Sequence, residues 1–176
     1  MVEQRRSGCS FLQHTVQPVL YRQGRPGGEA ERMDRLDVID TCTRMAWYTD
    51  HREWDALAGV FADQVTLDYT SLDGGEAVTL TPDRIVAAWR DTLGGFASTQ
   101  HLLANHLVDI DADSAICTAS FQATHRKAEA FGASLWTLGG SYRFDLVRVG
   151  GAWRIRGVAM TAVWGDGNRG LLPRPS

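Results

Sequence analysis

The sequence predicts an α+β fold, a cone-shaped α+β barrel in which a strongly bent antiparallel sheet wraps around N-terminal helices. Three observations support this prediction. Helical spacing of apolar residues dominates the chain up to residue 93, and long strand patterns separated by turn residues follow after Ser98. Gly139, Gly140 and Gly157 lie inside these strand patterns, where glycine weakens pairing unless the sheet bends.

Composition limits the class of protein. The 176 residues suffice for one domain with a sizeable core, and 18 Lys+Arg against 21 Asp+Glu give a formal charge of −3. This weak negative charge argues against nucleic acid as the main partner, because phosphate binding needs a concentrated basic face. No apolar run approaches the length of a membrane helix, and no signal-peptide segment is apparent, so we expect no membrane partner. Cys9, Cys42 and Cys117 are widely spaced, as in reduced thiols of a cytoplasmic protein.

The N-terminal third divides into an arm and a helix. Residues 1–33 mix arginine, proline and glycine, which predicts an arm that is in part disordered. The domain then covers residues 34–168, and 169–176 form a C-terminal tail. The helix that opens the domain is indicated by apolar and polar residues at steps of three and four, namely Leu36, Ile39, Thr43, Ala46, Trp47 and Asp50. Asp50 therefore belongs to the inward face of this helix.

Further elements follow in order. A short helix begins near Trp54, and Val65, Leu67 and Tyr69 alternate with polar residues as in a strand with one buried face. Another helix is predicted next, with Thr81 as its N-cap and Pro82 at its first position. Gly94-Gly95 ends this helix. The long strands are predicted at 100–110, 114–127, 135–149 and 152–164.

The strand that begins at Ser114 carries the most information. One of its faces is composed of Ala115, Cys117, Ala119, Phe121, Ala123 and His125. Small side chains leave room, so this face favours a cavity with His125 at its end. The alternative is a histidine at the sheet rim that is hydrogen-bonded to a carbonyl.

A carboxylate on the inward face of a helix needs a partner. Burial would desolvate Asp50, and a histidine is the natural group to pair with it. Such a pair fixes the imidazole tautomer and creates a base that works near neutral pH. The alternative is that Asp50 ends its helix in solvent. A metal site made of Asp50, His101 and His125 is a lesser alternative, because these groups serve acid/base chemistry without a metal, and we expect no metal or other cofactor.

Several other side chains are candidates for the wall of a pocket. The Tyr69 hydroxyl could donate to a substrate oxygen, although a core tyrosine with a hydrated hydroxyl is the more common arrangement. Indoles and thioethers suit a pocket for an apolar or aromatic ligand. The residues expected to bind the substrate are Tyr48, Trp54, Asn105, Phe121, Tyr142, Met160 and Trp164.

Five segments together resemble a known superfamily. They are Tyr48-Thr49-Asp50-His51-Arg52-Glu53-Trp54, Leu67-Asp68-Tyr69, Thr99-Gln100-His101, Ala123-Thr124-His125 and Gly151-Ala152-Trp153. In this order they resemble the SnoaL-like superfamily with the nuclear transport factor 2-like cone fold, and within it the scytalone dehydratase family. The resemblance covers about residues 34–166.

The resemblance implies roles for four residues. Asp50 matches the family's aspartate, His101 the histidine that it holds, His125 the second histidine, and Tyr69 one of the tyrosines that bind the substrate carbonyl through water. Departures put the family's own substrate in doubt. Thr49 stands where the family has a tyrosine, and Gly140 and Tyr142 stand where it has serine and asparagine. The tail after Trp164 is expected to be too short to cover the pocket as the family's longer tail does.

These observations lead to one main hypothesis and two alternatives. The main one is a cofactor-free dehydratase or isomerase that acts on a small cyclic, polyketide-like or aromatic-precursor substrate, with Asp50, His101, His125 and Tyr69 as the catalytic residues. A polyketide cyclase that closes a ring by aldol or epoxide-opening chemistry would use the same residues. A non-catalytic binding or assembly module would leave Asp50 and His101 unpaired. In each case a homo-oligomer, dimer or trimer, is expected, because the second face of the sheet is also apolar.

Overall fold

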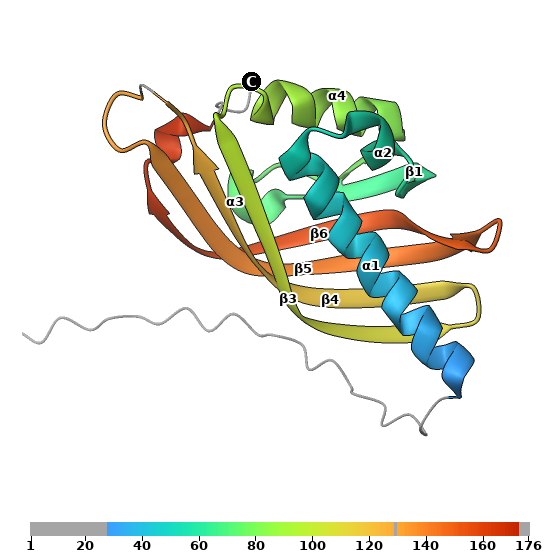
Figure 1. Cartoon of the computed structure of the whole chain (residues 1–176). Helices are drawn as coiled ribbons and strands as arrows, with labels where there is room; N and C mark the ends of the chain where they lie inside the picture. The colour runs from blue at the N-terminus through green and yellow to red at the C-terminus, as the bar shows by residue number, and fades with distance from the viewer. Residues whose placement is uncertain (1–27, 129, 173–176) are drawn as a thin grey trace, which may run out of the picture.

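The computed structural model describes residues 28–128 and 130–172 (Figure 1). In chain order, the elements are α1 (Glu29–His51), α2 (Trp54–Ala58), β1 (Phe61–Asp68), α3 (Thr70–Asp73), β2 (Val78–Leu80), α4 (Pro82–Leu93), β3 (Ser98–Asp111), β4 (Ser114–Arg126), β5 (Leu135–Val149), β6 (Ala152–Gly167) and the 3₁₀ helix η1 (Arg169–Leu171). The helices pack against one curved, unclosed sheet, which confirms the predicted cone-shaped α+β fold.

The six strands lie in the order β2-β1-β6-β5-β4-β3. The last four strands of the chain form an antiparallel meander, as the strand patterns predict. β1 adds to this meander by pairing parallel with β6, and β2 pairs antiparallel with β1. The sequence pattern does not predict α3 and β2, since segments of three or four residues are too short for a periodic pattern to develop.

Helix α1 begins at Glu29, before the predicted start at Asp34. The last residues of the predicted arm are therefore helical. The first turn of α1 carries Glu29 and Glu31, whose negative charges interact favourably with the positive end of the helix dipole. Residues 1–27 of the arm lie outside the described residues.

The buried face of α1 differs from the predicted one. It consists of Val38, Cys42, Met45, Ala46 and Thr49. Leu36 and Trp47, assigned to the inward face from their spacing, are instead 57% and 55% exposed. Both sides of this helix carry apolar residues, so spacing alone could not identify the side that the sheet covers.

Two of the β-bulges in the sheet set the direction of side chains that the sequence assigned to the cavity. In β3 the pairing with β4 shifts between Ala104 and Leu107, where Asn105 has a positive φ of 55°. In β6 the pairing with β5 shifts at Val163. Ala162 lies opposite Gly140 and Trp164 lies opposite Gly139, so Val163 is an extra residue without a partner in β5. Each extra residue reverses the alternation of inward and outward side chains beyond it.

The core lies between the concave face of the sheet and helices α1, α2 and α4. Its most completely buried large side chains include Phe144, Leu57 and Ile85. Cys42 and Cys117 are buried free thiols, and Cys9 lies outside the described residues. Within residues 28–128 and 130–172, no helix is both long and apolar enough to cross a membrane.

Candidate active site

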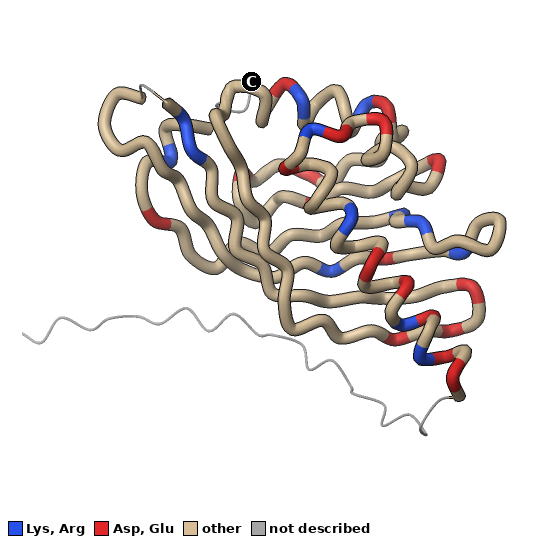
Figure 2. Tube along the Cα trace, in the orientation of Figure 1, with Lys and Arg blue, Asp and Glu red and all other residues tan. Residues whose placement is uncertain are grey.

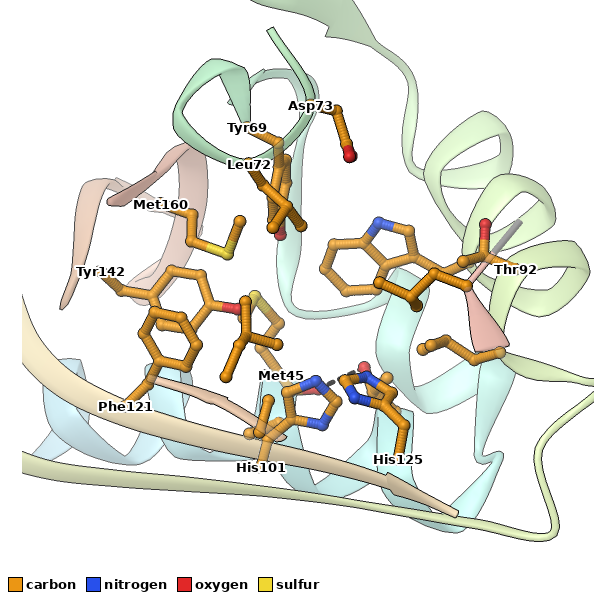
Figure 3. A pocket seen from close by; sticks show the side chains of 17 residues that line it. Met45, Tyr69, Leu72, Asp73, Thr92, His101, Phe121, His125, Tyr142 and Met160 are labelled. Carbon is orange, nitrogen blue, oxygen red and sulfur yellow. Dashed lines mark hydrogen bonds between the residues drawn. The ribbon is translucent and has the colours of Figure 1, made fainter. Parts of the chain in front are cut away.

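A cavity of about 220 Å³ opens between α1, α3, α4 and the concave face of the sheet (Figure 3). Its apolar wall includes Met45, Trp89, Phe121, Leu138, Met160 and Leu172. Its polar wall consists of Thr49, Tyr69, Asp73, Thr92, His101, His125 and Tyr142. The wall therefore combines a large apolar surface with a few polar groups, as is typical of small-molecule sites.

Asp50 and His101 form a hydrogen-bonded pair at the edge of this cavity. The Asp50 Oδ1 atom accepts a hydrogen bond of 2.7 Å from His101 Nδ1, and Asp50 Oδ2 accepts one of 2.6 Å from the His101 backbone N–H. Both side chains are largely shielded from solvent, with exposed fractions of 12% and 14%. Because Nδ1 donates to the carboxylate, the neutral form of the ring has its free lone pair on the other nitrogen, Nε2.

The electrostatics of Asp50 keep it ionised. Burial alone would raise the pKa of its carboxyl group, but the hydrogen bonds and charge of His101 and the Thr99 hydroxyl bond together lower that pKa below its ordinary value. Thr99 Oγ1 lies 2.9 Å from Asp50 Oδ1. The carboxylate thus accepts three hydrogen bonds, which fix its orientation toward the imidazole.

Arg52 holds this arrangement in place. Its Nη1 atom donates to Thr99 Oγ1 at 3.1 Å and to the Thr49 carbonyl at 3.0 Å, and its Nη2 atom donates to the Leu93 carbonyl at 3.0 Å. Since the guanidinium occupies a lone pair of the Thr99 oxygen, the Thr99 hydroxyl proton is directed to Asp50. Arg52 and Thr99 lie within the segments that resemble the superfamily, but no pattern in the sequence assigns either of them a role, because no spacing rule marks a supporting residue of this kind.

His125 lies next to His101 at the floor of the cavity (Figure 3). The two ring centroids are 5.5 Å apart and the ring planes are perpendicular. The His125 residue is only 4% exposed, and its Nδ1 atom has no hydrogen-bond partner among the described residues. Burial, followed by the neighbouring His101, lowers the pKa of His125 to about 4. At neutral pH His125 is therefore an uncharged ring.

Two phenols face the histidines (Figure 3). Burial is the main cause that raises the pKa values of Tyr69 and Tyr142. Each of the two hydroxyls also affects the pKa of the other. Both therefore remain protonated and can donate hydrogen bonds. Phe121 packs against Tyr142 with a centroid distance of 4.4 Å, and Met160 completes this side of the wall. Of the expected substrate-binding residues, these three line the cavity.

The other four expected substrate-binding residues do not line it. Asn105 is exposed and donates to Ser120 Oγ on the outer face, because the bulge in β3 reverses its direction. Trp164 is 48% exposed on the same outer face, because the bulge at Val163 reverses the alternation beyond Met160. Tyr48 packs against the hydrophobic core, and its neighbour Thr49 lines the cavity in its place. Trp54 contacts the guanidinium groups of Arg52 and Arg90, which lie 5.8 Å and 5.5 Å from its ring centroid.

The C-terminal segment contributes to the cavity, contrary to the expectation of an uncovered pocket. Leu172 lines the wall, and the preceding Leu171 is buried. Arg169 fixes this segment by donating to the Leu72 carbonyl at 2.7 Å and by pairing with Asp73 Oδ1 at 3.4 Å. The mixed apolar and polar composition of the tail gave no sign that it would return to the domain.

The described residues contain no group of three His, Cys, Asp or Glu side chains with the geometry of a metal site. The Nδ1 atom of His101 and both carboxylate oxygens of Asp50 are occupied by hydrogen bonds. The site can accept a proton at His101 Nε2, and it presents several neutral hydrogen-bond donors around an apolar cavity.

Comparisons with known proteins agree with this fold. A family model for the SnoaL-like domain matches residues 30–159. The uncharacterized protein Rv2910c of Mycobacterium tuberculosis is 28% identical over 130 residues, which cover 72% of this chain and 83% of that protein. The crystal structure of Kfla4162 from Kribbella flavida is similar with a TM-score of 0.74 and 29% identity, covering 80% of this chain and 97% of that one.

A more distant structural neighbour is a candidate scytalone dehydratase from Novosphingobium aromaticivorans. It has a TM-score of 0.67 and 16% identity, and the match covers 82% of this chain and 94% of the other. At this identity the likeness concerns the fold, which is the nuclear transport factor 2-like cone.

Proposed function

Because the chain belongs to the SnoaL-like domain family, we propose that it is a cofactor-free lyase or isomerase whose Asp50–His101 pair moves protons on a small cyclic substrate. The observation that carries the proposal is the 2.7 Å hydrogen bond between Asp50 Oδ1 and His101 Nδ1 beside an apolar cavity. A binding or assembly module has no need of this pair, which requires a partly buried carboxylate with three hydrogen bonds.

In the proposed reaction, His101 Nε2 removes a proton from the carbon next to a substrate carbonyl. The electron pair of that C–H bond forms an enolate, and the Tyr69 and Tyr142 hydroxyls are the groups available to polarise the carbonyl oxygen. Asp50 stabilises the imidazolium that forms at His101. For an elimination, the enolate then expels a hydroxyl from the next carbon as water.

The proton for the leaving hydroxyl comes from the His101 imidazolium. With a pKa of about 4, the His125 ring is neutral at neutral pH, so it has no extra proton to give and instead offers a hydrogen bond from a neutral ring. The same first step, followed by return of the proton to another carbon, gives an isomerase. We propose a polyketide-like or aromatic-precursor substrate, because the wall is rich in aromatic and thioether side chains.

Exchange of substrate protons with D₂O tests the first step without knowledge of the product. A panel of small cyclic β-hydroxy ketones is incubated with the protein in D₂O, and loss of the proton next to the carbonyl is followed by NMR. Asp50→Asn should lower the exchange rate by about 10² to 10⁴ while the protein remains folded, because the histidine loses its orienting carboxylate.

The matched control is Asp40→Asn, since Asp40 is an exposed carboxylate on the same helix that pairs with Arg44. This variant should exchange protons at the wild-type rate. An Asp50→Asn protein that keeps the wild-type rate, or a wild-type protein that binds the ketones without any exchange, would refute the proposal.

A further inference from the structure

Asp73 brings a negative charge to the wall of the cavity. Of the described residues that line this cavity, Asp73 is the only aspartate, glutamate, lysine or arginine. In Figure 3 the Asp73 carboxylate points toward the cavity from the end opposite His101 and His125. The Asp73 side chain is 44% exposed, so this acid lies at the mouth of the cavity, away from the proposed site of proton transfer.

Helix α3 holds Asp73 in a defined position. Tyr69 caps the start of α3, and Asp73 is its last residue, four positions later, so both side chains lie on the same side of this single turn. The Ser71 hydroxyl ties the turn to β6, since it donates to the Met160 carbonyl at 2.7 Å and accepts from the Ala162 N–H at 2.9 Å. The backbone of α3 therefore places the Asp73 carboxylate and the Tyr69 hydroxyl on one wall.

The cations that accompany the two acids of the site lie outside the wall. Arg169 pairs with Asp73 Oδ1 at 3.4 Å, but its side chain is 59% exposed and does not line the cavity. Arg52 donates to Thr99, which in turn donates to Asp50, so this guanidinium lies behind the floor of the cavity. Long stretches of β3 and β4 carry no charge at all (Figure 2). A molecule in the cavity is thus closer to the acids than to the cations.

This arrangement disfavours an anionic ligand in either orientation. A carboxylate at the mouth meets Asp73, and a carboxylate at the floor meets Asp50 behind the ring of His101. Like charges repel, and a buried charge without a cation loses its hydration without compensation. An uncharged hydroxyl, in contrast, can donate a hydrogen bond to the Asp73 carboxylate.

We propose that Asp73 determines the specificity of the cavity, which accepts uncharged ring compounds with a hydrogen-bond donor at the mouth and rejects carboxylates and phosphates. The inference rests on the proposed function, because it names the class of cyclic substrate on which the Asp50–His101 pair would act. The selection by charge is itself a property of binding. It can therefore be measured without turnover.

The test compares 2-naphthamide with 2-naphthoate, which have nearly the same shape and differ in charge. Isothermal titration calorimetry near neutral pH gives the dissociation constant of each. The wild-type protein should bind the amide at least about tenfold more tightly than the carboxylate. In Asp73→Asn this preference should fall by about tenfold, because the variant removes the repulsion and leaves the charge of Arg169 without its partner.

The matched variant is Arg169→Gln, which breaks the same ion pair but keeps the acid. Loosening of the C-terminal segment would change the preference in the same direction in both variants. Selection by charge changes it in opposite directions, so Arg169→Gln should increase the preference for the amide several-fold. Asp40→Asn removes an exposed charge of α1 and should keep the wild-type preference.

The inference is overturned by a wild-type protein that binds both compounds equally or does not bind the amide. It is also overturned by an unchanged preference in Asp73→Asn, or by a shift in the same direction in both ion-pair variants. Proton exchange with the ketones is the separate readout of the proposed function. A charge preference without exchange refutes only the reaction, and exchange without a charge preference refutes only the role of Asp73.

Discussion

At the scale of single residues, His125 connects the site to the stability of the protein. Its ring is buried next to His101, its Nδ1 atom has no hydrogen-bond partner among residues 28–128 and 130–172, and its pKa is lowered to about 4 in the folded state. In the unfolded chain a histidine has a pKa of about 6.5, so between these two pH values the unfolded state binds more protons. The free energy of unfolding therefore rises with pH across this window and is constant with respect to His125 above it.

His125→Phe should remove this dependence. The wild-type protein is expected to lose about 3 kcal/mol of stability through His125 as the pH falls from about 6.5 to 4, whereas phenylalanine has no proton to bind. Urea unfolding at several pH values measures the difference between the two proteins. The exposed His51→Gln serves as the control and should follow the wild-type curve. Parallel curves for wild type and His125→Phe would contradict the burial of a neutral ring.

The sequence predicted some of the site residues better than others. Asp50, His101 and His125 stood out because a carboxylate on a helix and histidines among small apolar residues are unusual, and the matching segments strengthened the assignment. Thr99 and Arg52 did not stand out, since a strand threonine and a surface arginine are common. Their role arises from four hydrogen bonds among three elements that only the fold brings together.

At the scale of elements, the two bulges decide which side chains reach the cavity. Strand positions were predicted to within a few residues because turn chemistry separates them. The assignment of Asn105 and Trp164 to the cavity was wrong, because one extra residue reverses the alternation and leaves no mark in the apolar pattern. A positive φ at a non-glycine residue is visible only in the structure.

Substitution at Asn105 tests the bulge in β3. Asparagine tolerates the left-handed backbone region better than most residues, and a β-branched residue does not, so Asn105→Val should destabilise the fold by about 1–2 kcal/mol. Asn105→Gly should stay close to wild-type stability, because glycine adopts a φ of 55° without strain. Both variants lose the hydrogen bond to Ser120, so their difference in urea unfolding isolates the backbone. Equal stabilities would show that the bulge does not constrain this residue.

At the scale of the whole molecule, the fold class followed from the order of helices before strands. The sequence indicated the antiparallel meander of β3 to β6 but not the parallel pairing of β1 with β6, because strand alternation contains no information about distant partners. The closure of the cavity by Leu172 depends on Arg169 meeting α3, a contact between residues nearly a hundred positions apart.

The position of Leu172 also affects how the protein should be produced. Since this residue belongs to the cavity wall, only four residues would separate the wall from a purification tag fused after Ser176. Ligand screens and soaking experiments should therefore use protein whose carboxyl end carries no added peptide.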